Sequence, residues 1–143
     1  FLRKKEVERN WYLKVLVEPG IQRISEFYRT STENYQQSAE LLDSNKGQSH
    51  EEYNKLKSKE FGKFQALKRD LEIEVIYPIQ IRYPDVGKQI TEQLRNLEDN
   101  YTSSLDAEKF NSSGIKEFHN FAANNRALFL DHLYGPLNKK FIF

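Results

Sequence analysis

The sequence has no cysteine, no methionine and a single tryptophan, Trp11. Without cysteine it cannot form disulfides, thiolate metal sites or a cysteine nucleophile. It also has no run of about 18 apolar residues, the length that a membrane-spanning helix needs. Its six glycines are scattered, so no glycine-rich loop is available to cradle a phosphate group. These absences exclude thiol enzymes, thiolate metalloproteins and nucleotide binders of the glycine-loop type.

What is present describes a folded and strongly charged chain. Of the 143 residues, 30% are charged, 38% are hydrophobic and 13% are aromatic. So high an aromatic content is untypical of a disordered chain, and this length is enough for one hydrophobic core. The net charge is only +1. Any preference for an anionic partner must therefore come from a local patch.

Helical periodicity dominates the sequence. In four long segments the apolar side chains recur every three or four residues, which at roughly 100° per residue places them on one side of a helix. These segments cover residues 21–43, 50–71, 86–105 and 115–134. Ser49 and Glu52 form a capping-box pattern at the start of the second segment. A loop is expected at 111–114, and Gly135-Pro136 is expected to end the last helix.

Two regions with proline interrupt this pattern. Residues 1–17 read as a short leading helix, and Glu-Pro-Gly at 18–20 is expected to break it. Residues 73–77 are rich in β-branched side chains, so a helix end and a short strand are both compatible with them, and we favour the helix. Pro78 and Pro84 predict a kink or an extended link between them.

The sequence therefore predicts an all-α fold: a single-domain helical bundle of four long helices with an additional short N-terminal helix. We assign residues 1–20 to a basic helical segment next to a membrane, and residues 21–143 to the bundle domain. Long amphipathic helices with many aromatic side chains often bury a second face between copies, so we also expect an oligomer.

No catalytic or metal-binding arrangement is apparent. His119 and His132 are thirteen residues apart on the last predicted helix, so they point to well separated faces. Asp131 precedes His132 directly, and adjacent helical residues do not face each other. His50 is expected in an exposed turn. We therefore predict a protein that is not an enzyme and that needs no cofactor and no metal.

The N-terminal segment carries the clearest hint of location. Five basic residues against two acidic ones give residues 1–17 a local charge of +3. Bulky apolar residues followed by a basic cluster and then by aromatic residues resemble the cytoplasmic end of a membrane-spanning helix. Because the chain begins on Phe1, we expect such a helix upstream; a tag or an interdomain loop is the alternative. The predicted membrane-proximal residues are Arg3, Lys4, Lys5, Trp11 and Tyr12.

These observations favour a non-enzymatic helical interaction domain on the cytoplasmic side of a membrane, in a protein that is anchored there. Basic residues near an anionic membrane surface contribute about 1 kcal/mol each to binding. The expected partner is a second copy of the chain or another protein.

The alternative hypothesis concerns a row of basic residues on the second predicted helix, which comprises Lys55, Lys59, Lys63 and Arg69. The three lysines are four residues apart and lie away from the apolar stripe. Such a row would bind a phosphate-bearing ligand, either a nucleotide messenger or a nucleic acid. A solvated face that is balanced by glutamates at helical spacing explains the same pattern.

Overall fold

The structure, a computed structural model, describes residues 2–106 and 112–138, and within these ranges it contains helices and no strand. The all-α prediction is thus confirmed. In chain order the elements are α1 (Leu2–Trp11), η1 (Tyr12–Val17), α2 (Glu18–Ser44), α3 (His50–Leu71), η2 (Glu72–Ile76), α4 (Tyr77–Arg82), α5 (Pro84–Asp106) and α6 (Ser112–Asn138). Two of these segments, η1 and η2, are π-helical.

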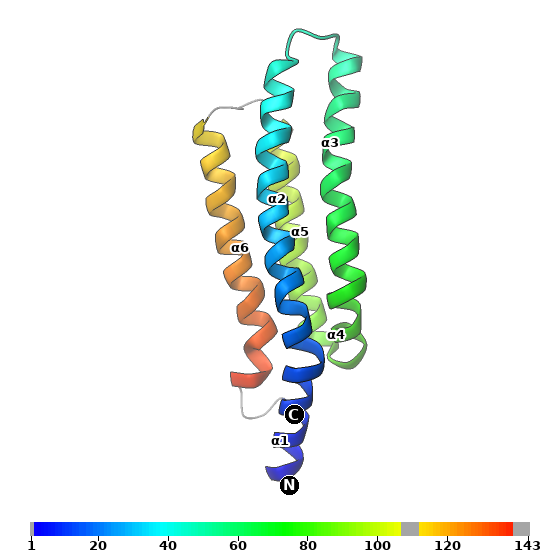
Figure 1. The fold of residues 1–143 in the computed structure, drawn as a ribbon, viewed down its shortest axis with the longest axis vertical. Helices are drawn as coiled ribbons and strands as arrows, with labels where there is room; N and C mark the ends of the chain where they lie inside the picture. Colours follow the sequence, from blue (N-terminus) through cyan, green and yellow to red (C-terminus); the bar gives the residue numbers. More distant parts are fainter. Residues whose placement is uncertain (1, 107–111, 139–143) are drawn as a thin grey trace.

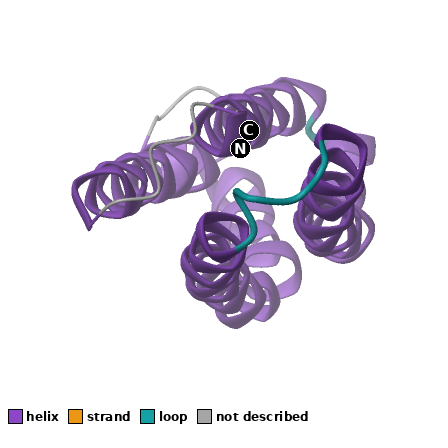
Figure 2. Cartoon of the chain, turned by 90° about the horizontal axis from the view of Figure 1, so that it is seen from above, coloured by secondary structure: helices purple, strands orange, loops and turns teal. Residues whose placement is uncertain are grey.

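The four long helices α2, α3, α5 and α6 form the predicted bundle, and its topology is up-and-down. They run side by side in alternating directions (Figure 1) and surround a common centre when seen from above (Figure 2). Each helix contacts its neighbours around the bundle: α2 packs on α3 and α6, and α5 packs on the same two helices. Short connections and antiparallel neighbours are typical of this topology.

The inward-facing residues are the ones that the helical periodicity predicts. Aromatic rings pack against one another in the core: Tyr35 stacks on Phe118 with 4.1 Å between ring centroids, and Tyr101 stacks on Phe64 at 4.5 Å. Ring pairs at such distances contribute beyond the area that they bury. The predicted cap of α3 is also present, since the Ser49 hydroxyl accepts a hydrogen bond from the Glu52 amide at 3.3 Å.

The expected break at residues 18–20 does not occur, because α1, η1 and α2 continue one another. A proline ring crowds the carbonyl four residues earlier in an α-helix. Pro19 lies two residues after the π-helical η1 ends, and Pro78 lies two residues after η2 ends. The wider π turn relieves that crowding, so the chain stays helical through both prolines.

The region that was compatible with helix or strand is therefore helical, as η2 and α4. The expected kink between Pro78 and Pro84 is confined to Tyr83, whose φ of −128° and ψ of 77° are not helical. The predicted loop at 111–114 falls partly outside the described residues, and α6 already begins at Ser112.

The prediction that α6 stops at Gly135-Pro136 is wrong, because α6 continues to Asn138. Pro136 is buried in the last turn, where side chains from the N-terminal helix supply partners for backbone carbonyls. The Tyr12 hydroxyl donates to the Leu133 carbonyl at 2.5 Å, and the Arg9 guanidinium donates to the Leu137 carbonyl. The Leu137 carbonyl is one of the last four of α6, which lack partners within the helix, and the two hydrogen bonds together attach α1 and η1 to the end of α6.

Candidate functional site

Exposed apolar side chains gather at one end of the molecule. Among the described residues, eight large hydrophobic side chains are exposed, and six of them lie on two helical stretches near the N-terminal end. We call these six the apolar face. They are Val7, Trp11 and Val15 on α1 and η1, and Ile73, Tyr77 and Ile81 on η2 and α4.

The spacing of each trio explains its common orientation. Residues four apart in a helix lie on the same side, and each trio repeats at that interval. The other side of each stretch is used for the core: Tyr12 and Val17 are fully buried beneath the first trio, and Ile79 is fully buried beneath the second. Each stretch therefore has two apolar sides, one that is buried in the core and one that is exposed to solvent.

The two stretches touch each other, so the trios belong to one region of the surface. The guanidinium carbon of Arg82 lies 4.6 Å from the centroid of the Trp11 ring. One residue further along each helix, the rings of Tyr12 and Tyr83 meet edge to face with 4.9 Å between centroids. The most exposed member of the apolar face, Ile81 at 86%, is the neighbour of Arg82 in the chain.

Basic side chains border the apolar face. We call them the basic rim, and all of its members are exposed: Arg3, Lys4, Lys14 and Arg82. The carboxylate of Glu74, which follows Ile73, is paired with Arg23 at 2.5 Å. Glu6 and Glu18 are exposed near the first trio. The Tyr77 hydroxyl donates to the carboxylate of Glu72 at 3.5 Å, so the second trio has an acidic neighbour. Residues 3–18 and 72–82 together with Arg23 hold seven basic and five acidic side chains, a net charge of +2.

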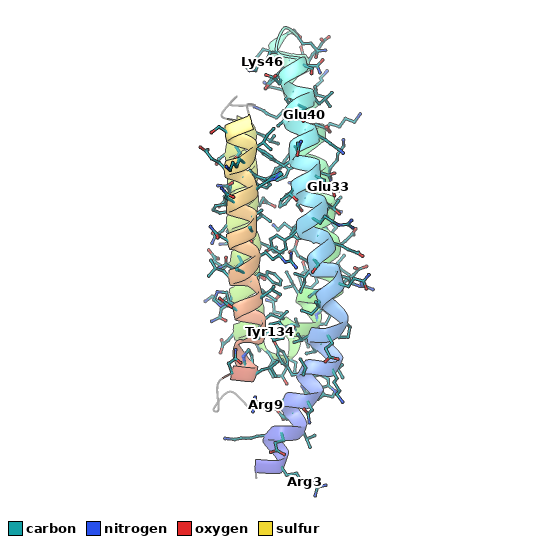
Figure 3. The ribbon with its side chains drawn as sticks, turned by 60° about the vertical axis from the view of Figure 1, so that its left-hand side comes forward. Arg3, Arg9, Glu33, Glu40, Lys46 and Tyr134 are labelled. Carbon is teal, nitrogen blue, oxygen red and sulfur yellow. The ribbon has the colours of Figure 1, made fainter. Side chains whose placement is uncertain are left out.

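The structure separates the residues that the sequence grouped as membrane-proximal. Arg3 lies at the tip of α1, beyond the end of α6 (Figure 3); Lys4 is exposed and Lys5 is partly buried. Trp11 is 37% exposed. Tyr12 is fully buried, and burial raises the pKa of its hydroxyl. Tyr12 thus serves the core and is not available to a lipid or a partner. Phe1 lies outside the described residues.

The predicted basic row on α3 is divided by ion pairs. Lys55 pairs with Glu51 at 3.5 Å, and Lys63 lies 2.6 Å from a carboxylate oxygen of Glu60, which is buried. Lys59 and Arg69 are exposed on the same helix. Two of the four residues proposed to bind an anion are therefore already neutralised by carboxylates of their own helix.

The two histidines do not converge. His132 lines an open hollow of about 1050 Å³ between the start of α5 and the end of α6, and Asp85, Lys88 and Asp131 line it too. His119 lies thirteen residues away on the same helix and does not line this hollow. Within the described ranges, no group of three side chains is placed to hold a metal ion.

Of the six residues of the apolar face, the sequence-based prediction of membrane-proximal residues included only Trp11. Ile73, Tyr77 and Ile81 repeat every four residues, which is the same signal that Val7, Trp11 and Val15 give. The β-branched residues of this stretch kept a short strand open as an alternative, although we favoured the helix. Residues four apart share a side in a strand as well as in a helix, so what the sequence did not predict is that this side lies in solvent beside α1.

Comparisons with protein-family models, with curated proteins and with solved structures give no match for this chain. None of the described helices combines the length and the apolar character that crossing a bilayer requires.

Proposed function

We propose that this chain is a non-enzymatic helical interaction domain of a membrane-anchored protein and that it lies next to the cytoplasmic surface of the bilayer. The observation that carries this proposal is the basic end of α1, which projects past the ends of α4 and α6 (Figure 1). Basic residues beside a membrane-spanning segment favour retention on the cytoplasmic side. A projecting end with Arg3 and Lys4 is suited to that position.

The interaction part of the proposal is supported by the exposed apolar side chains. Val7 and Ile81 are 60% and 86% exposed, so they are not part of the core that holds the bundle together. Contiguous apolar patches on a folded domain commonly mark the surface that meets a partner.

Fractionation of cells that express the complete gene product tests this proposal. The protein should remain in the membrane fraction after a high-salt wash, since an anchor is not displaced by salt. Protease that is added outside intact cells should not cleave the exposed loop at Lys46, and it should cleave this loop once the membrane has been permeabilised. Recovery of the complete gene product in the soluble fraction would contradict the proposal.

A second candidate function is the binding of a phosphate-bearing ligand on α3. Among the ion pairs of the described residues, none involves Lys59 or Arg69, and this leaves their charge for a ligand. Calorimetric titration with nucleotides at low and high salt tests it. Binding that weakens with salt and is lost in Lys59→Glu/Arg69→Glu supports this function, and binding that is unchanged in that variant rejects it.

A further inference from the structure

We propose that the apolar face itself binds an anionic lipid bilayer, so that the N-terminal end of the bundle lies on its side against the membrane. This inference rests on the proposed location next to a bilayer, and it adds the surface that meets the lipid. It assigns a role to Ile73, Tyr77 and Ile81, which lie about 60 to 80 residues after α1 in the sequence but beside it in the fold.

The residue types of the apolar face suit the boundary between headgroups and acyl chains. Tryptophan and tyrosine are enriched at that depth because each has an apolar ring with a polar atom. Trp11 and Tyr77 occupy the middle position of their trios, and aliphatic side chains flank each of them. An amphipathic helix with such a face lies in the plane of the interface.

The basic rim supplies the charge complementarity. Arg3, Lys4 and Lys14 border the trio on α1 and η1, and Arg82 lies between the two trios over the Trp11 ring. When the apolar side chains enter the bilayer, these cations come to the level of the anionic headgroups. Their long aliphatic stems allow the charged ends to remain in water.

A second copy of the chain is a poorer occupant of the same surface. A two-fold pair would place the basic rims of both copies against each other, and like charges across an interface are repelled. A bilayer of anionic lipids instead offers negative charge to the basic rim.

Co-sedimentation of this chain with vesicles tests the inference. We expect it to bind vesicles of phosphatidylcholine and phosphatidylserine, and to bind vesicles of phosphatidylcholine alone far more weakly. The variant Val7→Asn/Ile81→Asn should lower the partition coefficient about tenfold or more, since it removes the two most exposed apolar side chains. The matched control is Leu41→Asn, whose side chain is exposed to a similar degree as Trp11 but lies at the far end of α2.

Two outcomes would overturn the inference. One is equal binding by the chain and by Val7→Asn/Ile81→Asn. The other is a dimer in analytical ultracentrifugation that this variant abolishes, because the apolar face would then be an interface between copies. Circular dichroism of the variant separates loss of binding from loss of fold. A failure here leaves the proposed function standing if the complete gene product still remains with membranes after the salt wash.

Discussion

Gly87 lies directly against Gln80, so closely that a Cβ atom on Gly87 would come within 2.6 Å of the Gln80 Cβ and 2.7 Å of its Cα. This contact holds the start of α5 against α4, immediately after the chain turns at Tyr83. Because α4 carries Ile81 and Arg82, the position of the apolar face depends on this close approach.

Gly87→Ala should therefore destabilise the protein by about 1–3 kcal/mol, because the added methyl group meets backbone that cannot move cheaply. Gly62→Ala is the matched control: it is also a helical glycine, and apart from its chain neighbours and its own helix backbone nothing lies within 4 Å of the added methyl group. That variant should gain about 0.5–1 kcal/mol from the helix propensity of alanine. Urea unfolding followed by circular dichroism measures both. Equal effects of the two substitutions would contradict the close packing of α4 on α5.

Lys63 forms an ion pair with Glu60, which is 1% exposed and is the most deeply buried charged residue among those described. Removal of the partner leaves a buried carboxylate without its cation, so Lys63→Ala should cost about 1–3 kcal/mol of unfolding free energy. Lys59→Ala, one turn earlier, should change it by less than about 0.5 kcal/mol. Thermal and urea unfolding compare the two variants.

A double variant distinguishes the loss of charge compensation from the loss of side-chain packing. Adding Glu60→Gln to Lys63→Ala removes the buried charge and should recover part of the lost stability. If the double variant is no more stable than Lys63→Ala, the ion pair is not what stabilises this part of α3.

Buried tyrosines should make the fold sensitive to alkaline pH. Burial raises the pKa of Tyr101 to about 12 and also raises the pKa of Tyr35 and of Tyr28. In the unfolded chain these hydroxyls ionise near their ordinary pKa of about 10. The unfolded state therefore loses protons first, and stability that is complete below pH ~10 falls as the pH rises towards ~12.

Each tyrosine of this kind contributes a slope of up to about 1.4 kcal/mol per pH unit in that window. Urea unfolding at pH 8, 10 and 11 measures how steeply the free energy of unfolding falls with pH. Tyr101→Phe should make this slope smaller by the contribution of Tyr101 alone. A free energy of unfolding that is the same at pH 8 and pH 11 would contradict the burial of these hydroxyls.

The long helices could be predicted from the sequence because their information is local. A stripe such as that of α5, with Val86, Ile90, Leu94 and Leu97 inside, needs only the helical period to be recognised. The cap at Ser49 depends on residues three apart. In both cases the interacting residues are neighbours in the chain, so tertiary context does not alter the result.

The rest depends on contacts between residues far apart in the sequence. Tyr12 looked like an interfacial aromatic residue, but its hydroxyl bonds to the Leu133 carbonyl, 121 positions away. The chain stays helical at Pro19 and Pro78 because a π turn precedes each proline, and the periodicity of the sequence does not predict π turns. The apolar face forms only because Arg82 and Trp11 come together in the fold.

The most direct test of a lipid-binding apolar face uses Trp11, the only tryptophan in the chain, as an intrinsic probe. Its fluorescence should be measured while anionic vesicles that carry brominated acyl chains are added. Bromine near the headgroup end of the chain should quench Trp11 strongly, and bromine near the bilayer centre should quench it less, because tryptophan resides at the interface. Emission that keeps its intensity and its maximum at saturating lipid would contradict the account.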